Sequence, residues 1–237
     1  MNILAIDTST EILMVAAKTG EYWSGYSSNV GLKHASQLAH HINKLTKEIG
    51  LKMNQYDLIA TGIGPGSFTG IRIGIATAYG IVRASNASLV GFSLIEVIAY
   101  SYRHFPGLLI PIIDARKNRY YSSFFRKGNQ INEFLDISPN DLSKLIREYN
   151  KFNEPVLLTG PAAHEFAKIV NNNWMVSDLY QGEYPAVFFE IAKLKSQMKQ
   201  LTVSPLYLRK SEAEIGIVTG ETNSKNKNDK VIQSKKK

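Results

Sequence analysis

Short apolar blocks alternate with polar ones along the first half of the chain. Short runs in which apolar residues are continuous, or alternate with polar ones, predict strands, and longer segments with apolar residues three and four apart predict helices. The predicted strands are residues 2–7, 12–17, 21–28, 58–63 and 89–93, and the predicted helices are residues 33–50, 71–87 and 94–103. The first three strands are close enough in sequence to form a meander joined by tight turns.

The second half of the chain repeats this pattern. Its predicted strands are residues 108–114, 120–126, 131–137 and 155–160, and its predicted helices are residues 138–150, 161–170 and 186–200. Two copies of a three-stranded meander followed by alternating helices and strands are the layout of the actin-like and sugar-kinase (ASKHA) fold, an α/β fold with two similar lobes facing a cleft. We expect residues 1–105 to form the first lobe and residues 106–210 the second, with the last helix crossing back.

Composition agrees with a globular protein and places much of the charge on one segment. Of 237 residues 44% are hydrophobic, and the chain has no cysteine, which excludes disulfides and thiolate sites. The formal net charge is +8, and residues 219–237 hold six Lys against one Glu and one Asp. We expect residues 211–237 to form a basic, disordered tail that either attracts phosphate backbones or is simply solvated. No membrane-spanning run or signal peptide is evident, so the expected location is the cytoplasm, with no membrane partner.

A glycine-rich segment joins a predicted buried strand to the predicted helix at residues 71–87. It reads Gly64-Pro65-Gly66-Ser67-Phe68-Thr69-Gly70-Ile71-Arg72-Ile73-Gly74. Such a turn gathers backbone N–H groups at a helix N-terminus, where the helix dipole favours an anion, so a phosphate cradle is one interpretation. The segment is neither a Walker loop nor a GxGxxG dinucleotide turn. The alternative is a structural turn that packs the helix closely on the sheet or against another protein.

Four polar side chains are candidates for contact with a phosphate or a nucleotide. Asp7, Thr8 and Ser9 follow the first strand, at the hairpin that actin-like lobes use to hold a metal–phosphate group, and Arg72 lies at the start of the helix after the glycine turn. Asp, Thr and Ser are also common turn formers, so ordinary turn chemistry is the alternative.

Two further pairs of residues have a possible chemical role. Asp114 and Arg116 either hold a phosphate or form a structural ion pair. His34 and His41 are seven apart on one predicted helix, but no Asp or Glu stands between them at ligand spacing, and we expect no metal site.

Five segments occur in a characteristic order across residues 2–210. They are Ile6-Asp7-Thr8-Ser9, the glycine-rich segment, Val90-Gly91-Phe92-Ser93-Leu94, Ile113-Asp114-Ala115-Arg116 and Pro205-Leu206-Tyr207-Leu208-Arg209. In these segments the chain resembles the TsaB (YeaZ) family of the bacterial tRNA threonylcarbamoyladenosine system.

The resemblance implies a scaffold subunit. TsaB-like proteins share the actin-like fold with the catalytic subunit TsaD and pair with it, or with a second TsaB when TsaD is absent. TsaC makes threonylcarbamoyl-adenylate, TsaE supplies an ATPase, and TsaD transfers the threonylcarbamoyl group to N6 of the adenosine beside the anticodon in tRNAs that read codons starting with A. The expected partners are therefore TsaD and TsaE, with tRNA contacted indirectly and a homodimer when the chain is alone. No cofactor of its own is expected, because ATP and a metal belong to the partner subunits.

The resemblance also bears on catalysis. TsaD-like proteins hold their metal with a His-x-x-x-His pair, and the matching positions here are Ser93 and Val97. Valine cannot bind a metal, so we expect no catalytic residue and no metal. The alternative function is an actin-fold ATP-dependent phosphotransferase or a metallopeptidase.

The helices that flank the glycine turn form the TsaD contact in the family. The residues expected there are Leu38, Ile42, Leu45, Phe68, Ile71, Ile75 and Tyr79. Three small residues four apart, Gly70, Gly74 and Ala78, are expected to let a helix of the partner approach closely. The alternative is that these side chains line the core of their own lobe.

Overall fold

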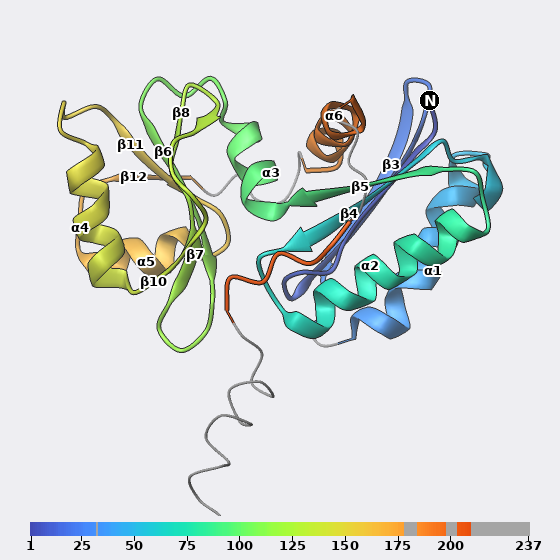
Figure 1. Ribbon diagram of the computed structural model, residues 1–237, viewed down its shortest axis with the longest axis horizontal. Coiled ribbons are helices and arrows are strands. Elements are labelled where there is room, and N and C mark those ends of the chain that lie inside the picture. The colour runs from blue at the N-terminus through green and yellow to red at the C-terminus, as the bar shows by residue number, and fades with distance from the viewer. Residues whose placement is uncertain (32, 178–183, 198–202, 210–237) are drawn as a thin grey trace, which may run out of the picture.

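The first lobe is built on a five-stranded mixed sheet. The computed structural model describes residues 1–31, 33–177, 184–197 and 203–209, arranged as two lobes (Figure 1). The strand order β3-β2-β1-β4-β5 comprises β1 (Ile3–Asp7), β2 (Ile12–Thr19), β3 (Tyr22–Asn29), β4 (Leu58–Gly64) and β5 (Ser88–Ser93). β1, β2 and β3 form the predicted antiparallel meander, while β4 and β5 run parallel to β1. Every residue of β1 is buried, because helices cover both faces of this central strand.

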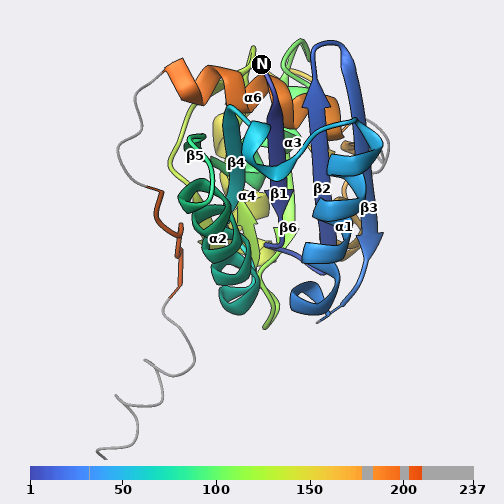
Figure 2. The same ribbon diagram turned by 90° about the vertical axis from the view of Figure 1, so that its right-hand side faces the viewer.

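Two pairs of helices cover the first sheet. α1 (His34–Glu48) and α2 (Phe68–Arg83) pack on one face, and α6 (Tyr184–Gln197) packs on the other beside α3 (Leu94–Ser101), as Figure 2 shows. A short 3-10 helix, η1 (Met53–Gln55), precedes β4. α2 begins at Phe68 and not at residue 71 as predicted, because the Ser67 side chain caps it by accepting a hydrogen bond from Gly70 N at 3.2 Å.

The second lobe repeats this layout. Its sheet follows the path β10-β7-β6-β11-β12, with β8 paired to β6 and β9. The strands are β6 (Leu108–Asp114), β7 (Tyr120–Ser122), β8 (Phe125–Arg126), β9 (Asn129–Gln130), β10 (Leu135–Ile137), β11 (Val156–Thr159) and β12 (Met175–Ser177), and the helices are α4 (Pro139–Tyr149) and α5 (Ala163–Val170). An antiparallel meander followed by two parallel strands recurs, so the predicted two-lobed α/β layout is confirmed.

Two details of the second sheet differ from the prediction. The strand predicted at residues 120–126 is broken into β7 and β8, because Phe124 N turns away from the ladder and donates to Asn132 Oδ1 at 2.6 Å. β12 was not predicted, and it extends the parallel part of the sheet beside β11.

The last helix returns to the first lobe, as expected for a chain end that crosses back. Phe188 on α6 packs on Phe92 of β5, with ring centroids 4.8 Å apart. One apolar cluster combines side chains of the first sheet, α3, α6 and β6, so it links the two lobes. The division of the chain at residue 105 stays a prediction, and the predicted tail at residues 211–237 lies outside the described residues. Within the described ranges, no helix has the length and apolar content needed to cross a membrane.

Candidate functional site

A cleft with a cavity volume of about 970 Å³ lies between the lobes. The first lobe lines it with the β1–β2 turn and the start of α2, and the second lobe with the ends of β6 and β11 and the start of α5. β1 and β4 end at this edge in one sheet, and β6 and β11 in the other. The carboxyl ends of parallel strands are where open α/β sheets bind their ligands, so the cleft is the candidate ligand site.

The glycines before α2 make room for the β1–β2 turn of the same lobe. Ser67 N donates to Ser9 O at 2.6 Å, and Thr8 Oγ1 donates to Gly70 O at 2.7 Å. A Cβ atom on Gly66 would lie 2.0 Å from Ser9 O, and one on Gly70 would lie 2.0 Å from Thr8 O. The structural-turn interpretation therefore accounts for these two glycines, because the backbones of two turns touch there.

The four candidate phosphate contacts are not gathered in the cleft. Ser9 lines it, whereas Asp7 and Thr8 are buried behind its wall and Arg72 is exposed on α2, outside the cleft. Burial raises the pKa of Asp7 to about 6, although hydrogen bonding by Ser9 and Thr8 works in the opposite direction. A nucleotide contact by these four residues stays a prediction.

His34 belongs to the cleft, which the sequence analysis did not anticipate. It is 5% exposed, lines the cleft at the start of α1, and its Nε2 has no hydrogen-bond partner among the described residues. Burial lowers the pKa of His34, although the backbone of Thr10 and Ile12 favours the charged ring. The order of the strands could have predicted this position of His34. β3 brings the chain back to the sheet edge where β1 ends, and His34 follows β3 in the sequence. His41 lies elsewhere, stacked on Tyr26 with ring centroids 3.4 Å apart.

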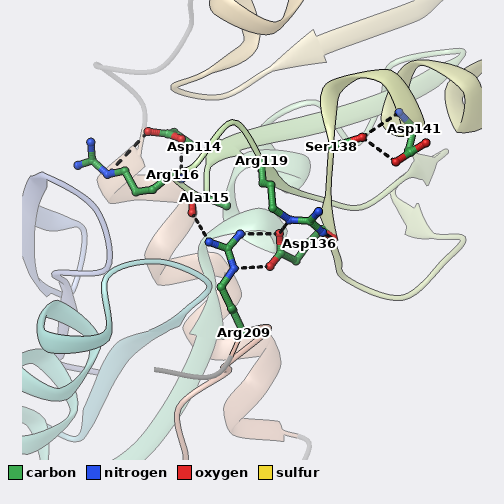
Figure 3. Close-up of polar contacts among 8 residues, drawn as sticks. All are labelled: Asp114, Ala115, Arg116, Arg119, Asp136, Ser138, Asp141 and Arg209. Atoms are coloured by element: carbon green, nitrogen blue, oxygen red, sulfur yellow. Dashed lines mark hydrogen bonds and ion pairs between the residues drawn. The ribbon is translucent and has the colours of Figure 1, made fainter. Parts of the chain in front are cut away.

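An ion pair joins the two sides of the cleft. The Arg116 guanidinium of the second lobe donates to the Glu11 carboxylate of the first. Arg116 Nε also lies 3.8 Å from Asp114 Oδ2 (Figure 3). Arg116 N also donates to Asp114 Oδ1 at 2.7 Å, so of the two interpretations of Asp114 and Arg116 the ion pair is present. With Glu165, three carboxylates line the cleft against one guanidinium. A polyphosphate entering the cleft would therefore meet an excess of negative charge.

Known proteins match nearly the whole chain. The model of a family described as "TsaD: tRNA N6-adenosine threonylcarbamoyltransferase" matches residues 28–181. The "tRNA threonylcarbamoyladenosine biosynthesis protein TsaB" of Bacillus subtilis is 25% identical over 224 residues, covering 90% of this chain and 96% of that protein. The protein of the same name from Haemophilus influenzae is 28% identical over 227 residues, covering 88% and 94%. The chain belongs to the TsaB (YeaZ) family, within this wider TsaD family.

Solved structures agree on the fold of this TsaB-family chain. "YeaZ from Pseudomonas aeruginosa" has a TM-score of 0.70 at 19% identity, covering 87% of this chain and 99% of that one. A second structure, described as an uncharacterized protein with similarity to peptidase YEAZ from Pseudomonas aeruginosa, has a TM-score of 0.74 at 22% identity, covering 88% and 99%. The actin-like ASKHA fold is thereby confirmed, and the TsaB relatives give the chain a role in tRNA threonylcarbamoyladenosine biosynthesis.

In this TsaB-family chain, structural roles belong to Ser93 and Val97, the two positions that the sequence analysis expects to match the TsaD metal pair. Ser93 caps α3, where its Oγ accepts from Ile95 N at 3.2 Å and its own N donates to Glu96 Oε2 at 2.9 Å. Val97 is fully buried in the cluster that links the lobes. Across the described ranges, no three His, Asp or Glu side chains are grouped so that they could hold a metal ion.

The residues expected at the TsaD contact fall into two groups. Five are between 0% and 8% exposed and pack in the chain's own core, namely Leu38, Ile42, Leu45, Ile71 and Ile75. These five side chains hold α1 and α2 on the sheet. A partner protein would therefore contact the exposed residues of the two helices instead. Phe68 is half-buried and Tyr79 is 39% exposed, so these two reach the surface. The place of the TsaD contact itself stays a prediction.

The stripe of small residues on α2 faces inward, which corrects the expectation that it meets a second chain. A Cβ atom on Gly74 would lie 2.5 Å from Thr8 Oγ1, and Ala78 is fully buried in the core of the first lobe. Gly70 meets Thr8 O in the same way. These residues are small because α2 lies close to the β1–β2 turn.

Proposed function

We propose that this chain is the non-catalytic scaffold subunit required for threonylcarbamoylation of N6 of the adenosine beside the anticodon in tRNAs that read codons starting with A. It acts in the cytoplasm by dimerising with TsaD, together with TsaE, and it forms a homodimer when alone. ATP and the metal belong to those partners. The observation that carries the proposal is the pair Ser93 and Val97, a helix cap and a core side chain at the positions of the TsaD metal pair.

The exposed face of α2 is suited to contact with TsaD. Ala76 and Gly80 are exposed and one helical turn apart, and a Cβ atom on Gly80 would meet no atom within 4 Å. Small side chains let a helix of a partner pack at short interaxial distance. The buried side chains on the opposite side of α2, such as Ile71 and Ile75, hold this face in place.

Co-purification with TsaD from the same organism tests the proposal. We expect the wild-type chain to form a stoichiometric complex and Gly80→Glu to lose it, because a charged side chain would then stand in the contact. Replacing a glycine in an exposed helix favours the helix by up to about 1 kcal/mol, so unfolding would not explain the loss. Asn140→Glu adds the same side chain at an exposed position of α4 in the other lobe and should bind TsaD normally.

Other outcomes of the co-purification would indicate a different function or a different contact with TsaD. If the wild-type chain does not bind TsaD but turns over ATP or a peptide by itself, the phosphotransferase or metallopeptidase function replaces the scaffold function. If the complex forms with both variants, the α2 contact is wrong while the scaffold role remains. In that case, omission of the chain from a reaction with TsaC, TsaD, TsaE and tRNA decides whether modification requires it.

A further inference from the structure

The first sheet ends on one side at β3. This strand pairs with β2 over eight residues and with no other strand of the described ranges, and Figure 2 shows it at the edge of the sheet. A two-residue turn pairs Thr19 with Tyr22, so Tyr22 and every second residue after it direct their backbone groups toward β2. Val30 N continues this alternation and donates to Glu11 O at 3.0 Å. The residues whose backbone groups are directed outward, away from β2, are therefore Trp23, Gly25, Ser27 and Asn29.

Both faces of β3 are held by helices of its own lobe. On one face Tyr26 stacks on His41 of α1, with ring centroids 3.4 Å apart. On the other face Gly25 lies against α6, where a Cβ atom on this glycine would be 2.7 Å from Pro185 Cγ. The strand is thus fixed in place, and its outward backbone groups are what it can offer to a partner.

The sequence of β3 does not oppose pairing with a further strand. Native proteins usually protect the edge of a sheet with lysine, with proline or with a short edge strand. Residues 22–29 read YWSGYSSN, with no charged residue and no proline. Tyr22 is 81% exposed and Trp23 is 47% exposed. β3 is therefore a long, uncharged edge strand with exposed aromatic side chains at one end, which is the kind of surface to which another strand adds.

The outward residues of β3 are placed symmetrically about Tyr26, and this symmetry favours a second copy of the same strand as the partner. In an antiparallel pair with a two-fold axis at Tyr26, Gly25 of one copy stands opposite Ser27 of the other. Trp23 stands opposite Asn29 in the same way, so every outward N–H and C=O group finds a partner. The two copies of Tyr26 form a non-hydrogen-bonded pair, in which side chains approach most closely. Because β3 carries no charge, pairing with itself brings no like charges together.

We propose that β3 of one copy pairs antiparallel with β3 of a second copy, so that two five-stranded sheets become one continuous sheet. The inference rests on the homodimer of the proposed function and gives that homodimer its contact. α2 packs mainly on β4, which lies on the far side of β1 from β3, so homodimerisation and TsaD capture use different surfaces. A single pair of strands is smaller than a standard interface of about 1,600 Å², so we expect a dissociation constant in the micromolar range.

Sedimentation equilibrium of the full chain at several concentrations measures the dimer, and Ser27→Pro tests the strand contact. Proline has no N–H and its ring would stand in the shared edge, so the dissociation constant should rise by at least about tenfold. The Ser27 N–H is directed away from β2, so the first sheet keeps its own hydrogen bonds. Ser27→Ala is the matched control, because it keeps the N–H and should dimerise within about twofold of the wild type.

Ser27→Lys is a second variant that leaves the backbone unchanged. Ser27 is exposed, so the lysine side chain needs no burial. In the paired strands the two added charges lie on the same face close to the axis, and their repulsion should weaken the dimer, more at low salt than at high salt. Hydrogen exchange reports the pairing directly, since the amides of Gly25 and Ser27 should exchange several-fold more slowly in concentrated wild-type protein than in dilute protein.

The outcomes separate this inference from the scaffold role. If the wild-type chain captures TsaD but stays monomeric by itself, the homodimer and this inference fail together, and the scaffold role remains. If the wild type is a dimer and Ser27→Lys dimerises as tightly as Ser27→Ala, the homodimer uses another surface and only this inference is overturned, even should Ser27→Pro unfold. If the folded Ser27→Pro variant loses TsaD, the edge belongs to a strand of TsaD, which also overturns it. A dimer that is lost on substitution of Ser27, in a chain that captures no TsaD, would support the strand contact and overturn the scaffold role.

Discussion

Gly70 and Gly80 lie on the same helix in opposite surroundings. A Cβ atom on Gly70 would lie 2.0 Å from the carbonyl oxygen of Thr8, whereas one on Gly80 would meet nothing within 4 Å. The first glycine is required by a backbone contact between α2 and the β1–β2 turn, and the second is not required by the fold of the chain itself. Glycine alone in a sequence does not distinguish these two cases.

A pair of alanine substitutions tests this difference. Gly70→Ala should lower the free energy of unfolding by about 3 kcal/mol or more, because the methyl group must displace backbone. Gly80→Ala should raise it by up to about 1 kcal/mol, because alanine favours the helix and finds open space. Urea unfolding of both variants against the wild type measures the two changes. Equal effects of the two substitutions would contradict the close contact at Gly70.

Asp7 links stability to pH. Burial raises its pKa from 3.8 to about 6, so between these values the folded state retains a proton that the unfolded chain releases. Its contribution to stability is therefore fully present below pH 3.8 and is lost as the pH rises through about 6. A shift of this size corresponds to about 3 kcal/mol. Asp7→Asn cannot ionise and should remove this fall, which urea unfolding across the same pH interval would reveal; an unchanged fall would assign it to another group.

Among the elements, residues 203–209, the strap, are joined to the second lobe through Arg209, whose Nε and Nη2 donate to the Asp136 carboxylate at 2.7 and 2.8 Å. Burial on its own would raise the pKa of Asp136, but hydrogen bonds from Arg209 and Arg119 outweigh it and lower the pKa. The contribution of Asp136 is therefore present above its ordinary pKa of 3.8 and is lost as the pH falls through the lower folded-state value.

Asp136→Asn should release the end of the strap. The amide of Leu206, bonded to Ile63 O in the wild type, should then exchange its hydrogen about tenfold faster or more, because strap opening costs less free energy. Hydrogen exchange read by mass spectrometry measures this. Asp141→Asn is a suitable control, since Asp141 pairs with Ser138 on α4 away from the strap. Unchanged exchange at Leu206 in Asp136→Asn would show that the strap is held by its other contacts.

The predicted elements agree with the structure where the periodicity of apolar residues determines the element. They differ where a hydrogen bond to one side chain determines where the element begins or breaks. The heptad spacing gave α1, and the apolar runs gave β1, β4 and β6, because buried strands and amphipathic helices require those patterns. The start of α2 was misplaced because the cap at Ser67 allows helix to begin within a glycine-rich segment. The break between β7 and β8 depends on Asn132, whose amide takes the place of a strand partner.

At the scale of the whole molecule, the repeat in the sequence predicted the two lobes, but the site between them was only partly predictable. Glu11 and Arg116 are 105 positions apart and meet only because the lobes face each other. The expected interface residues were an ambiguous case, since an apolar stripe such as Leu38, Ile42 and Leu45 looks the same whether it covers its own sheet or another protein. Side-chain exposure in the folded chain was needed to separate the two.

The return of α6 to the first sheet also has a consequence for synthesis on the ribosome. β5 is complete at Ser93, yet α6, which covers one face of its sheet together with α3, begins only at Tyr184. A nascent chain must therefore carry an apolar surface of the first lobe, including Phe92 on β5, while the second lobe is still being translated. We therefore expect a fragment that ends before residue 184 to aggregate more readily than the full chain.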